Sequence, residues 1–543
     1  MTFAARTAFV ATALALAFLA GCGPQQADLE TGRAKIRPAA VAPGGILETD
    51  YAEAIAATLA AAGDNAPQLR RFLDHFAASG DAQKAKAAEF LVANMAPHGF
   101  TEVALYDANE TEVPYNALEY DDFEQALAAR IALEKDHKGL HMKRKRHDAD
   151  IRTLSADYLI EQTDQAFDAW RTLPWASGVT FDTFCNYVLP YRGSGEPPDR
   201  WRTPCREALA ETLPAADPND IRAVSKLCNK QRGRWVQFRK KCYLHPTDQG
   251  FDDMRRTGLG RCEDLSNMRS YLNRANGIPM TSDYTPAWAR GNNNHAWNAL
   301  LDGNGRAYPP NKPMRNAAKV YRKMYAMQPD LPAFHAAEGE TIPPWLAGRC
   351  YRDVTAEYRP VHDVTVSLTR RPGPKGTWAY LCVFNSGRWT PIAAGRIDRD
   401  ANSAAFPDLG DHIAYLPAYF VGKKLVPAGP VTLLEAGGKV RLLDEPVREA
   451  DGRIATTIRR MKDVDTNADT GKPIPAIKVQ PGKAYELFYW DGKWESLGEK
   501  TAADDSPLAF DNLPAGRMYR LVEKGGRNLE RPFTIDAGKQ VLW

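Results

Sequence analysis

The stretch Gly258-Leu-Gly-Arg-Cys262-Glu-Asp-Leu-Ser-Asn-Met-Arg-Ser-Tyr-Leu-Asn-Arg-Ala-Asn-Gly-Ile-Pro279 decides the fold of the central part of the chain. Its apolar residues recur at helical spacing from Leu265 to Ala275, and the Gly-Ile-Pro sequence ends the pattern. Two glycines precede Cys262, so we expect this cysteine in the first turn of the helix. Unpaired amide groups and the helix dipole stabilise a thiolate there and can hold an oxyanion. Cys262 is therefore a candidate nucleophile, and the alternative is a structural half-cystine.

The candidate base is His295, which opens a predicted strand directly after a polar loop. An activated thiol also needs a third group that orients the imidazole. Asp302 lies seven residues further along the extended strand, roughly 23 Å away at about 3.3 Å per residue, which is too far. If Asp302 pairs with Gly305 and the turn carries a one-residue bulge, position 295 faces Asn311. The predicted catalytic residues are Cys262, His295 and Asn311, and the third depends on this assumed register.

These residues resemble the motifs of the transglutaminase-like superfamily. Gly-Arg-Cys-Glu-Asp-Leu-Ser and Ala-Asn-Gly-Ile-Pro are followed by His-Ala-Trp-Asn and a glycine turn. Further pieces, among them Phe184-Cys-Asn-Tyr-Val-Leu-Pro-Tyr-Arg192, resemble transglutaminase-like lipoproteins of Bacteroidetes; the resemblance covers about 150–543 and is most specific over 184–322. It implies a papain-like core with a cysteine at a helix N-terminus and His and Asp on adjacent strands. Asn311 stands where the family usually has Asp, although an asparagine orients the imidazole in papain-like proteases.

The resemblance implies acyl transfer as the reaction. Cys262 would attack a carboxamide or peptide carbonyl, and His295 would take the thiol proton and then protonate the leaving amine. A peptidase or amidase is favoured over a cross-linking enzyme, with a protein or peptide as substrate, including one linked to glycan or peptidoglycan. Candidate pocket residues on the loop before the histidine are Trp288, Arg290 and Asn294, and Trp288 fits a core position equally well. No cofactor is expected.

The beginning of the chain resembles a bacterial lipoprotein signal. An apolar run over 8–20 follows Arg6 and is too short to span a bilayer stably. It ends in Leu19-Ala20-Gly21-Cys22, which resembles the lipobox, so we expect cleavage before Cys22 and a lipid on its thiol. Gly23 resembles the residue found in proteins sorted to the outer membrane. The expected location is the cell envelope, by a lipid anchor; the alternative is an ordinary secretory signal with a chance cysteine.

Composition bounds the remaining possibilities. The chain has 543 residues, 44% of them hydrophobic and 25% charged, which indicates several globular domains. With 70 Lys and Arg against 67 Asp and Glu, nothing supports nucleic-acid binding as the main function. His137 and His141 have a spacing that could bind metal, but no acidic or cysteine ligand is nearby, and no metal site is predicted.

The cysteine count is the unusual feature of the composition. Eight cysteines occur, and removal of Cys22 for lipidation leaves an odd number, so at least one thiol stays unpaired in an oxidising compartment. If Cys262 is that thiol, six cysteines remain for up to three disulfides.

The predicted fold class is α+β, with a helical N-terminal region, a papain-like, transglutaminase-like core and two tandem β-sandwich modules. The predicted segments are 1–21 (signal peptide), 22–45 (tether), 46–150 (helical region), 151–350 (core), 351–447 (first β module) and 448–543 (second β module). Helical patterns cover 50–62, 67–79, 82–95, 116–136 and 154–172. Beyond about 355, short β-branched and aromatic runs separated by turn residues indicate an all-β region.

The two β modules share an internal repeat. Ala379–Trp389 aligns with Ala484–Trp494 after a slip of one residue, and Tyr415 aligns with Tyr519 at an offset of 104. Such modules usually bind or position other groups. The alternative function is therefore a catalytically silent surface protein that recognises glycan or protein through these modules. The aromatic side chains that would favour it are Trp389, Trp490 and Trp494.

Overall fold

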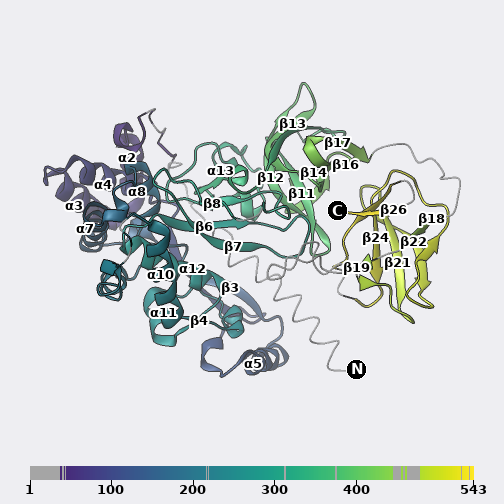
Figure 1. Cartoon of the computed structure of the whole chain (residues 1–543), viewed down its shortest axis with the longest axis horizontal. Helices are drawn as coiled ribbons and strands as arrows, with labels where there is room; N and C mark the ends of the chain where they lie inside the picture. Colours follow the sequence, from purple (N-terminus) through teal and green to yellow (C-terminus); the bar gives the residue numbers. More distant parts are fainter. Residues whose placement is uncertain are drawn as a thin grey trace.

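The computed structural model describes residues 37–39, 42, 44–215, 217, 219–310, 313–373, 376–443, 454–456, 459–460, 477–526, 529–536 and 539–543. The chain is α+β, as predicted: helices gather in its N-terminal half and antiparallel sheets in its C-terminal half (Figure 1). The predicted signal peptide with Cys22, and Asn311, lie outside the described residues. Within the described ranges, no helix is both long enough and apolar enough to cross a membrane.

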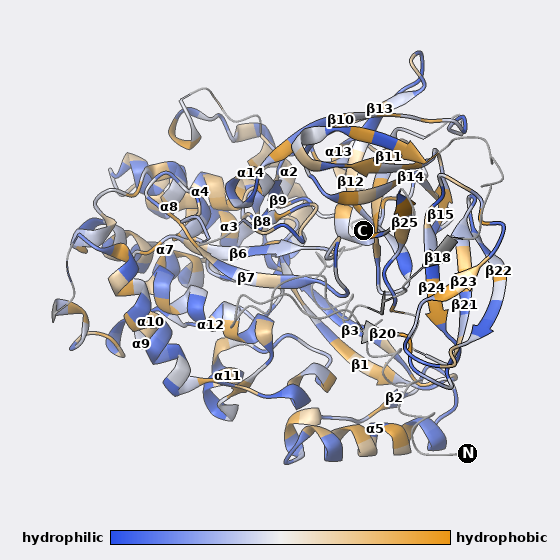
Figure 2. Ribbon diagram, turned by 45° about the vertical axis from the view of Figure 1, so that its right-hand side comes forward, coloured by the Kyte–Doolittle hydropathy of each residue, from blue (hydrophilic) through white to orange (hydrophobic). Residues whose placement is uncertain are grey.

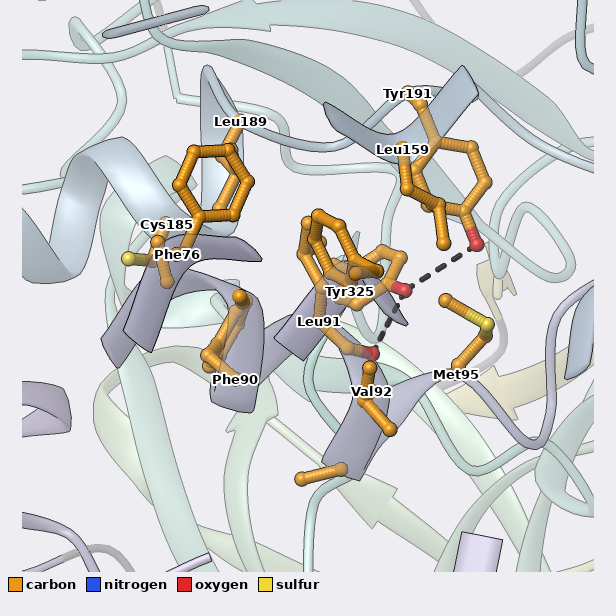
Figure 3. Packing of buried hydrophobic residues seen from close by; sticks show 14 of the residues in the cluster. Phe76, Phe90, Leu91, Val92, Met95, Leu159, Cys185, Leu189, Tyr191 and Tyr325 are labelled. Carbon is orange, nitrogen blue, oxygen red and sulfur yellow. Dashed lines mark hydrogen bonds between the residues drawn. The ribbon is translucent and has the colours of Figure 1, made fainter. Parts of the chain in front are cut away.

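Four of the predicted N-terminal helices form one packed layer. They are α2 (Ala52–Ala62), α3 (Ala66–Ala77), α4 (Ala82–Asn94) and α7 (Ala156–Thr172). Their buried side chains, with Phe76 and Phe90 among them, form a single cluster around Tyr325 (Figure 3). Asp81 caps α4 by accepting the backbone N–H of Lys84 at 3.1 Å. The helical prediction for these segments is confirmed.

The same region also holds a sheet that the periodicity did not indicate. Strands β1 (Gly99–Tyr106), β2 (Glu112–Val113) and β3 (His141–Ala149) pair in the order β2-β1-β3, and α5 (Phe123–Asp136) precedes β3. The basic residues at 143–146 thus lie on strand β3, where Lys143 pairs with Glu110, and Lys145 with Glu112 at 3.0 Å. These exposed pairs solubilise the edge strand.

A four-stranded sheet backs the long helix α12 (Cys262–Ala275) in the centre of the chain. Its order is β7 (His295–Leu300), β6 (Met280–Thr285), β8 (Tyr321–Lys323), β9 (Tyr351–Asp353). Around α12 lie α8 (Phe181–Tyr187), α9 (Arg202–Glu207), α10 (Ile221–Trp235) and α11 (Phe251–Thr257). Met268, Leu272 and Ala275 of α12 pack with Trp201 and Cys228 in one apolar cluster. This packing fixes the helix that begins with Cys262.

The turn after β7 differs from the assumed register. Asp302 N–H donates to the carbonyl of Arg306 at 2.8 Å, and Leu301 pairs with Ala307. This bridge makes the turn one residue longer than the assumed pairing of Asp302 with Gly305. The turn is longer because the Asp302 carboxylate accepts the N–H groups of Asn304 and Arg306, each at 2.9 Å. The pairing assumed at the turn is therefore wrong, and the role of Asn311, which lies outside the described residues, stays a prediction.

The seven described cysteines are free thiols: Cys185, Cys205, Cys228, Cys242, Cys262, Cys350 and Cys382. The expectation of up to three disulfides is therefore wrong for the described residues. Most of these thiols act as small apolar side chains in separate clusters: Cys185 packs among the N-terminal helices and Cys382 in the first β module. Burial raises the pKa of Cys228 to about 12, which keeps that thiol protonated.

The first β module is an eight-stranded antiparallel sheet. It comprises β10 (Val361–Ser367), β11 (Trp378–Asn385), β12 (Arg388–Asp398), β13 (Ser403–Gly410), β14 (Ile413–Val421), β15 (Lys424–Pro427), β16 (Val431–Leu434) and β17 (Val440–Leu443). The long strand β12 pairs β11 along most of its length and β13 at its end. Inward side chains from both halves meet in one core, and β11 is strongly hydrophobic in Figure 2.

The second β module repeats part of this arrangement. Its main sheet contains β21 (Ala484–Trp490), β22 (Trp494–Thr501), β24 (Tyr519–Glu523), β25 (Phe533–Asp536) and β26 (Lys539–Leu542), while β18 (Ile454–Thr456) pairs β23 (Leu508–Phe510). The hydroxyl of Tyr415 donates to the carbonyl of Gly410 at 2.6 Å, and Tyr519 donates equivalently to Pro514. Both bonds span five residues, which supports the internal repeat.

The tryptophans named for glycan recognition lie between the two modules. Trp389 and Trp490 meet edge to face at 5.6 Å, and Trp490 meets Trp494 at 5.1 Å. Trp494 also contacts Phe384 of β11 at 5.7 Å. These side chains therefore join the modules to each other, and their rings are packed together instead of forming an open aromatic platform.

Candidate active site

Backbone geometry places Cys262 at the first position of α12. Gly258 ends α11 in the left-handed region at φ 66°, and β5 (Leu259–Gly260) then pairs in parallel with β4 (Gln237–Phe238). A Cβ on Gly260 would lie 2.9 Å from that of Asp264, so only glycine allows this close approach. The Asp264 carboxylate accepts the backbone N–H of Arg261 at 2.9 Å and fixes the first turn. The predicted position of Cys262 is confirmed.

The thiol of Cys262 is exposed and has an aromatic neighbour. The Tyr243 hydroxyl lies 3.1 Å from the Cys262 sulfur. Phe238 meets the Tyr243 ring at 5.8 Å and is itself 44% exposed. An apolar surface thus adjoins the nucleophile. Sequence reasoning missed both aromatics, because only the parallel pairing of β4 with β5 brings this segment beside Cys262.

His295 begins β7 and lies between two indole rings. Its ring centroid is 6.0 Å from that of Trp288 and 5.7 Å from that of Trp297. Desolvation lowers the pKa of His295 below its ordinary value of 6.5, so the imidazole is neutral at physiological pH. Among the described residues, none forms a hydrogen bond to this imidazole. The two indoles are therefore the groups that orient the ring within the described structure.

A hydrogen bond between helix and sheet places Cys262 and His295 at the same end of their layer. The Asn298 amide donates to the carbonyl of Ser266 at 2.9 Å. Strand β6 returns along α12 and β7 pairs antiparallel with β6, so α12 and β7 run in the same direction. From this contact the helix extends about 6 Å back to Cys262, and the strand extends about 10 Å back to His295. The described polar partner of Cys262 is nevertheless Tyr243.

The loop before His295 is held by both β modules. The Asn385 amide donates to the carbonyls of Trp288 at 2.9 Å and Asn293 at 2.8 Å. The Arg531 guanidinium donates to Gly291 at 3.1 Å and to the carbonyl of Ala289. Burial lowers the pKa of Arg531 to about 9. These contacts join segments about 95 and 240 residues apart, and no local sequence pattern indicates such a contact.

The predicted pocket residues have different environments. Trp288 stacks beside His295, as a residue lining the site would. It also packs against the cluster containing Ala317 and Tyr358, which is a core contact, and its role as a pocket residue stays a prediction. The charge of Arg290 contributes to the lowered pKa of Arg531, which places it towards the C-terminal module. Asn294 is partly buried next to His295.

Metal ligands do not gather in the part of the chain that the structure describes. No group of three or more His, Cys, Asp or Glu side chains there could hold a metal ion. His137 ends α5 as its C-cap, and His141 begins β3 with its ring bonded to the carbonyl of Gly139 at 3.0 Å.

The comparisons with known proteins are weak. No model of a protein family matches the chain, and no curated protein matches it. Among solved structures, the chain aligns with the crystal structure of red sea bream transglutaminase at 9% identity and a TM-score of 0.18, over 86% of this chain and 78% of that one. A TM-score of this size carries no argument about fold or activity. The transglutaminase-like core stays a prediction from the sequence motifs.

Proposed function

We propose that this chain is a cysteine acyl-transfer enzyme of the transglutaminase-like type, with Cys262 as nucleophile and His295 as base. The observation that carries the proposal is an exposed thiol at the first residue of α12, at the same end of the helix–sheet layer as an imidazole held beside two indole rings. This combination offers a reachable nucleophile, first-turn amide groups and a neutral base.

The proposed reaction uses these groups in sequence. The Cys262 sulfur attacks the carbonyl carbon of an amide while His295 accepts the thiol proton. The first-turn amides of α12 and the Tyr243 hydroxyl stabilise the negative oxygen. The C–N bond then breaks, the amine leaves with the proton from His295, and a thioester remains on Cys262. Water, deprotonated by His295, releases the acid and restores the thiol.

Hydrolysis is proposed over cross-linking because of the exposure of the thiol. A thioester at an exposed position is open to water, and transfer to an amine succeeds only where water is excluded. Cys262 lies at the surface, with Tyr243 on one side. The proposed substrate class is accordingly a peptide or carboxamide, and the products are an acid and an amine.

Asn311 remains the proposed third member of the site from the sequence. This role rests on the sequence, because Asn311 lies outside the described residues. Exchange of Asn311 for alanine should slow acylation about tenfold to a hundredfold if its side chain orients the imidazole. An unchanged rate would mean that Asn311 does not orient the His295 imidazole and that Trp288 and Trp297 do so.

Anchoring through Cys22 is part of the same proposal. A lipid on this residue would place the soluble part of the chain at the cell envelope, facing peptide substrates there. Labelled palmitate should be incorporated into the wild-type protein and not into Cys22→Ser. Equal incorporation in both would contradict the anchor.

Trapping with an amide-like electrophile tests the nucleophile. A chloroacetamide-capped peptide should label the folded wild-type protein at Cys262, as located by peptide mass spectrometry. Cys262→Ala should lose the label, and the matched control Cys350→Ala should keep it. Labelling that survives in Cys262→Ala would remove the basis of the proposed function.

A further inference from the structure

A cavity of about 160 Å³ lies on a different side of α12 from the exposed thiol. Neither Cys262 nor His295 lines it. Its walls come from the segment before β1, the Gly-rich loop after α8, strands β6 and β8, and the residues leading into β9. This volume corresponds to about five water molecules, enough for a small organic acid. Tyr325, a member of the buried cluster drawn in Figure 3, supplies an apolar floor on one side of the cavity.

Most charges on the cavity wall are already neutralised. Lys323 pairs with Glu263 at 2.8 Å, and Asp248 pairs with Arg261. The guanidinium of Arg192 donates to the Asp150 carboxylate at 2.9 Å. These three pairs add no net charge to the cavity.

Arg274 does not supply a free charge either. Its guanidinium donates to the carbonyls of Met280 at 2.9 Å and Arg192 at 2.7 Å. The buried Glu196 carboxylate lies close enough to raise its pKa, against a larger lowering by burial. The donors of Arg274 are therefore used by the fold.

Arg349 is the charged residue on this wall for which the described structure shows no ion pair and no hydrogen bond. Within the described part of the chain it forms no ion pair and no side-chain hydrogen bond, and its Nε is buried without a partner. Its one described side-chain contact is the ring of Phe334 at 5.8 Å. Burial lowers the pKa of Arg349, which is the cost of holding this charge without a counterion.

Two further polar atoms on the same wall lack partners. The Nε2 of His147 and the Oδ1 of Asn186 are both buried without a hydrogen bond among the described residues. The other ring nitrogen of His147 is fixed by Thr101 at 2.8 Å, so the ring has a defined orientation. Buried polar atoms without partners are uncommon in folded proteins, and these residues also line the cavity, so they are candidates for contacts with a bound ligand.

We propose that this cavity binds a small molecule carrying one carboxylate, with Arg349 as its counterion and His147 as a second hydrogen-bonding group. One unpaired cation matches one negative charge. A phosphate dianion fits less well, because the single unpaired cation balances only one of its two charges. The apolar floor suits a short hydrocarbon body. The proposal does not depend on catalysis by Cys262.

Binding of simple acids tests the site directly. Propionate and succinate should bind the full chain saturably in isothermal titration calorimetry, whereas propionamide and inorganic phosphate should bind at least about tenfold more weakly. Arg349→Gln should weaken the acids at least about tenfold, because the counterion is removed. The matched control is Arg352→Gln, an exposed arginine three residues away outside the cavity, which should bind like wild type.

A second variant reduces the volume of the cavity and leaves its charge unchanged. Ala347→Leu on the cavity wall should abolish binding while Arg349 stays in place. Near-ultraviolet circular dichroism reports whether each variant keeps its packing. The wild-type result decides by itself: no saturable binding of either acid up to about 10 mM overturns the proposal. Undiminished binding in folded Arg349→Gln, or tighter binding of phosphate than of the acids, also overturns it.

Discussion

Cys262 begins the helix that backs the four-stranded sheet, Cys350 directly precedes one of its edge strands, and their environments differ in almost every respect. Cys262 is exposed and contacts a tyrosine hydroxyl. The sulfur of Cys350 lies 4.0 Å from the Nε2 of His98. Closeness to a histidine alone would favour Cys350.

The burial of Cys350 and His98 instead disfavours Cys350 as a nucleophile. It raises the pKa of Cys350 to about 12 and lowers the pKa of His98, so this thiol keeps its proton and this imidazole stays neutral. The Nε2 of His98 is moreover bonded to the carbonyl of Tyr325 at 2.9 Å. The cysteine beside a histidine is thus a buried structural pair, while the exposed cysteine at the start of α12 is the candidate nucleophile.

The largest effect expected from this difference is in thiol reactivity. A rise in pKa from 9.0 to about 12 lowers the thiolate fraction near neutral pH about a thousandfold. Iodoacetamide should therefore alkylate Cys262 at least about 100-fold faster than Cys350 in the folded protein. Peptide mass spectrometry over a time course measures both rates. In denaturant the alkylation rates of the two cysteines should become equal. Similar rates in the folded protein would contradict the proposed difference between their environments.

The stability of the four-stranded sheet depends on a buried ion pair. Arg322 of β8 donates to Asp283 of β6 at 2.9 Å and to Glu357 at 2.8 Å. Arg322→Met leaves Asp283 buried without its counterion, which should lower the free energy of unfolding by about 3–5 kcal/mol. Urea unfolding measures this, with the exposed Arg352→Gln as a control that should change it by less than about 0.5 kcal/mol. A loss below about 1 kcal/mol in Arg322→Met would contradict the structural role.

The loop before His295 also depends on the C-terminal module. Arg531→Met removes the donors to Gly291 and Ala289, so amide exchange in the loop 288–294 should accelerate about tenfold. Hydrogen-exchange mass spectrometry measures this, with Arg517→Met in the same module as the matched control. Exchange in α3 should be the same in both variants. An unchanged loop in Arg531→Met would show that the module does not hold it.

The smallest expected effect concerns pH. Because the pKa of His295 lies below 6.5, the imidazole is a base throughout the range above that value and loses this role only as pH falls through its lowered pKa. The His295-dependent part of the acylation rate should therefore change less than about twofold between pH 7.5 and 6.5. Stopped acylation time courses at each pH measure it. A tenfold fall over that interval would place the imidazole pKa higher.

Local patterns predicted the parts of this molecule that local forces determine. The start of α12 at Cys262, the strand at His295 and the four N-terminal helices follow from periodicity and turn residues. Tyr243 and Arg531 could not be found in this way, because their contacts arise from pairings between distant segments. The turn at Asp302 was misjudged by one residue because an aspartate side chain stabilises the longer loop.

The cysteine prediction failed for a different reason. Counting thiols assumes that they pair, whereas this fold distributes them among separate apolar clusters. Cys262 is nevertheless the exposed one among the seven described cysteines, and the site prediction depends on that exposure.

The central claim is that His295 activates Cys262. The most direct measurement is the rate of acyl-enzyme formation with an activated peptide amide, followed by intact mass, in wild type, His295→Gln and the control His335→Gln. His335 is on α13 (Pro332–His335) and bonds to the carbonyl of Pro329 at 2.8 Å, outside the site. The rate of acyl-enzyme formation should fall by about 10²–10⁴-fold in His295→Gln and should not change in His335→Gln. Equal rates in wild type and His295→Gln would contradict it.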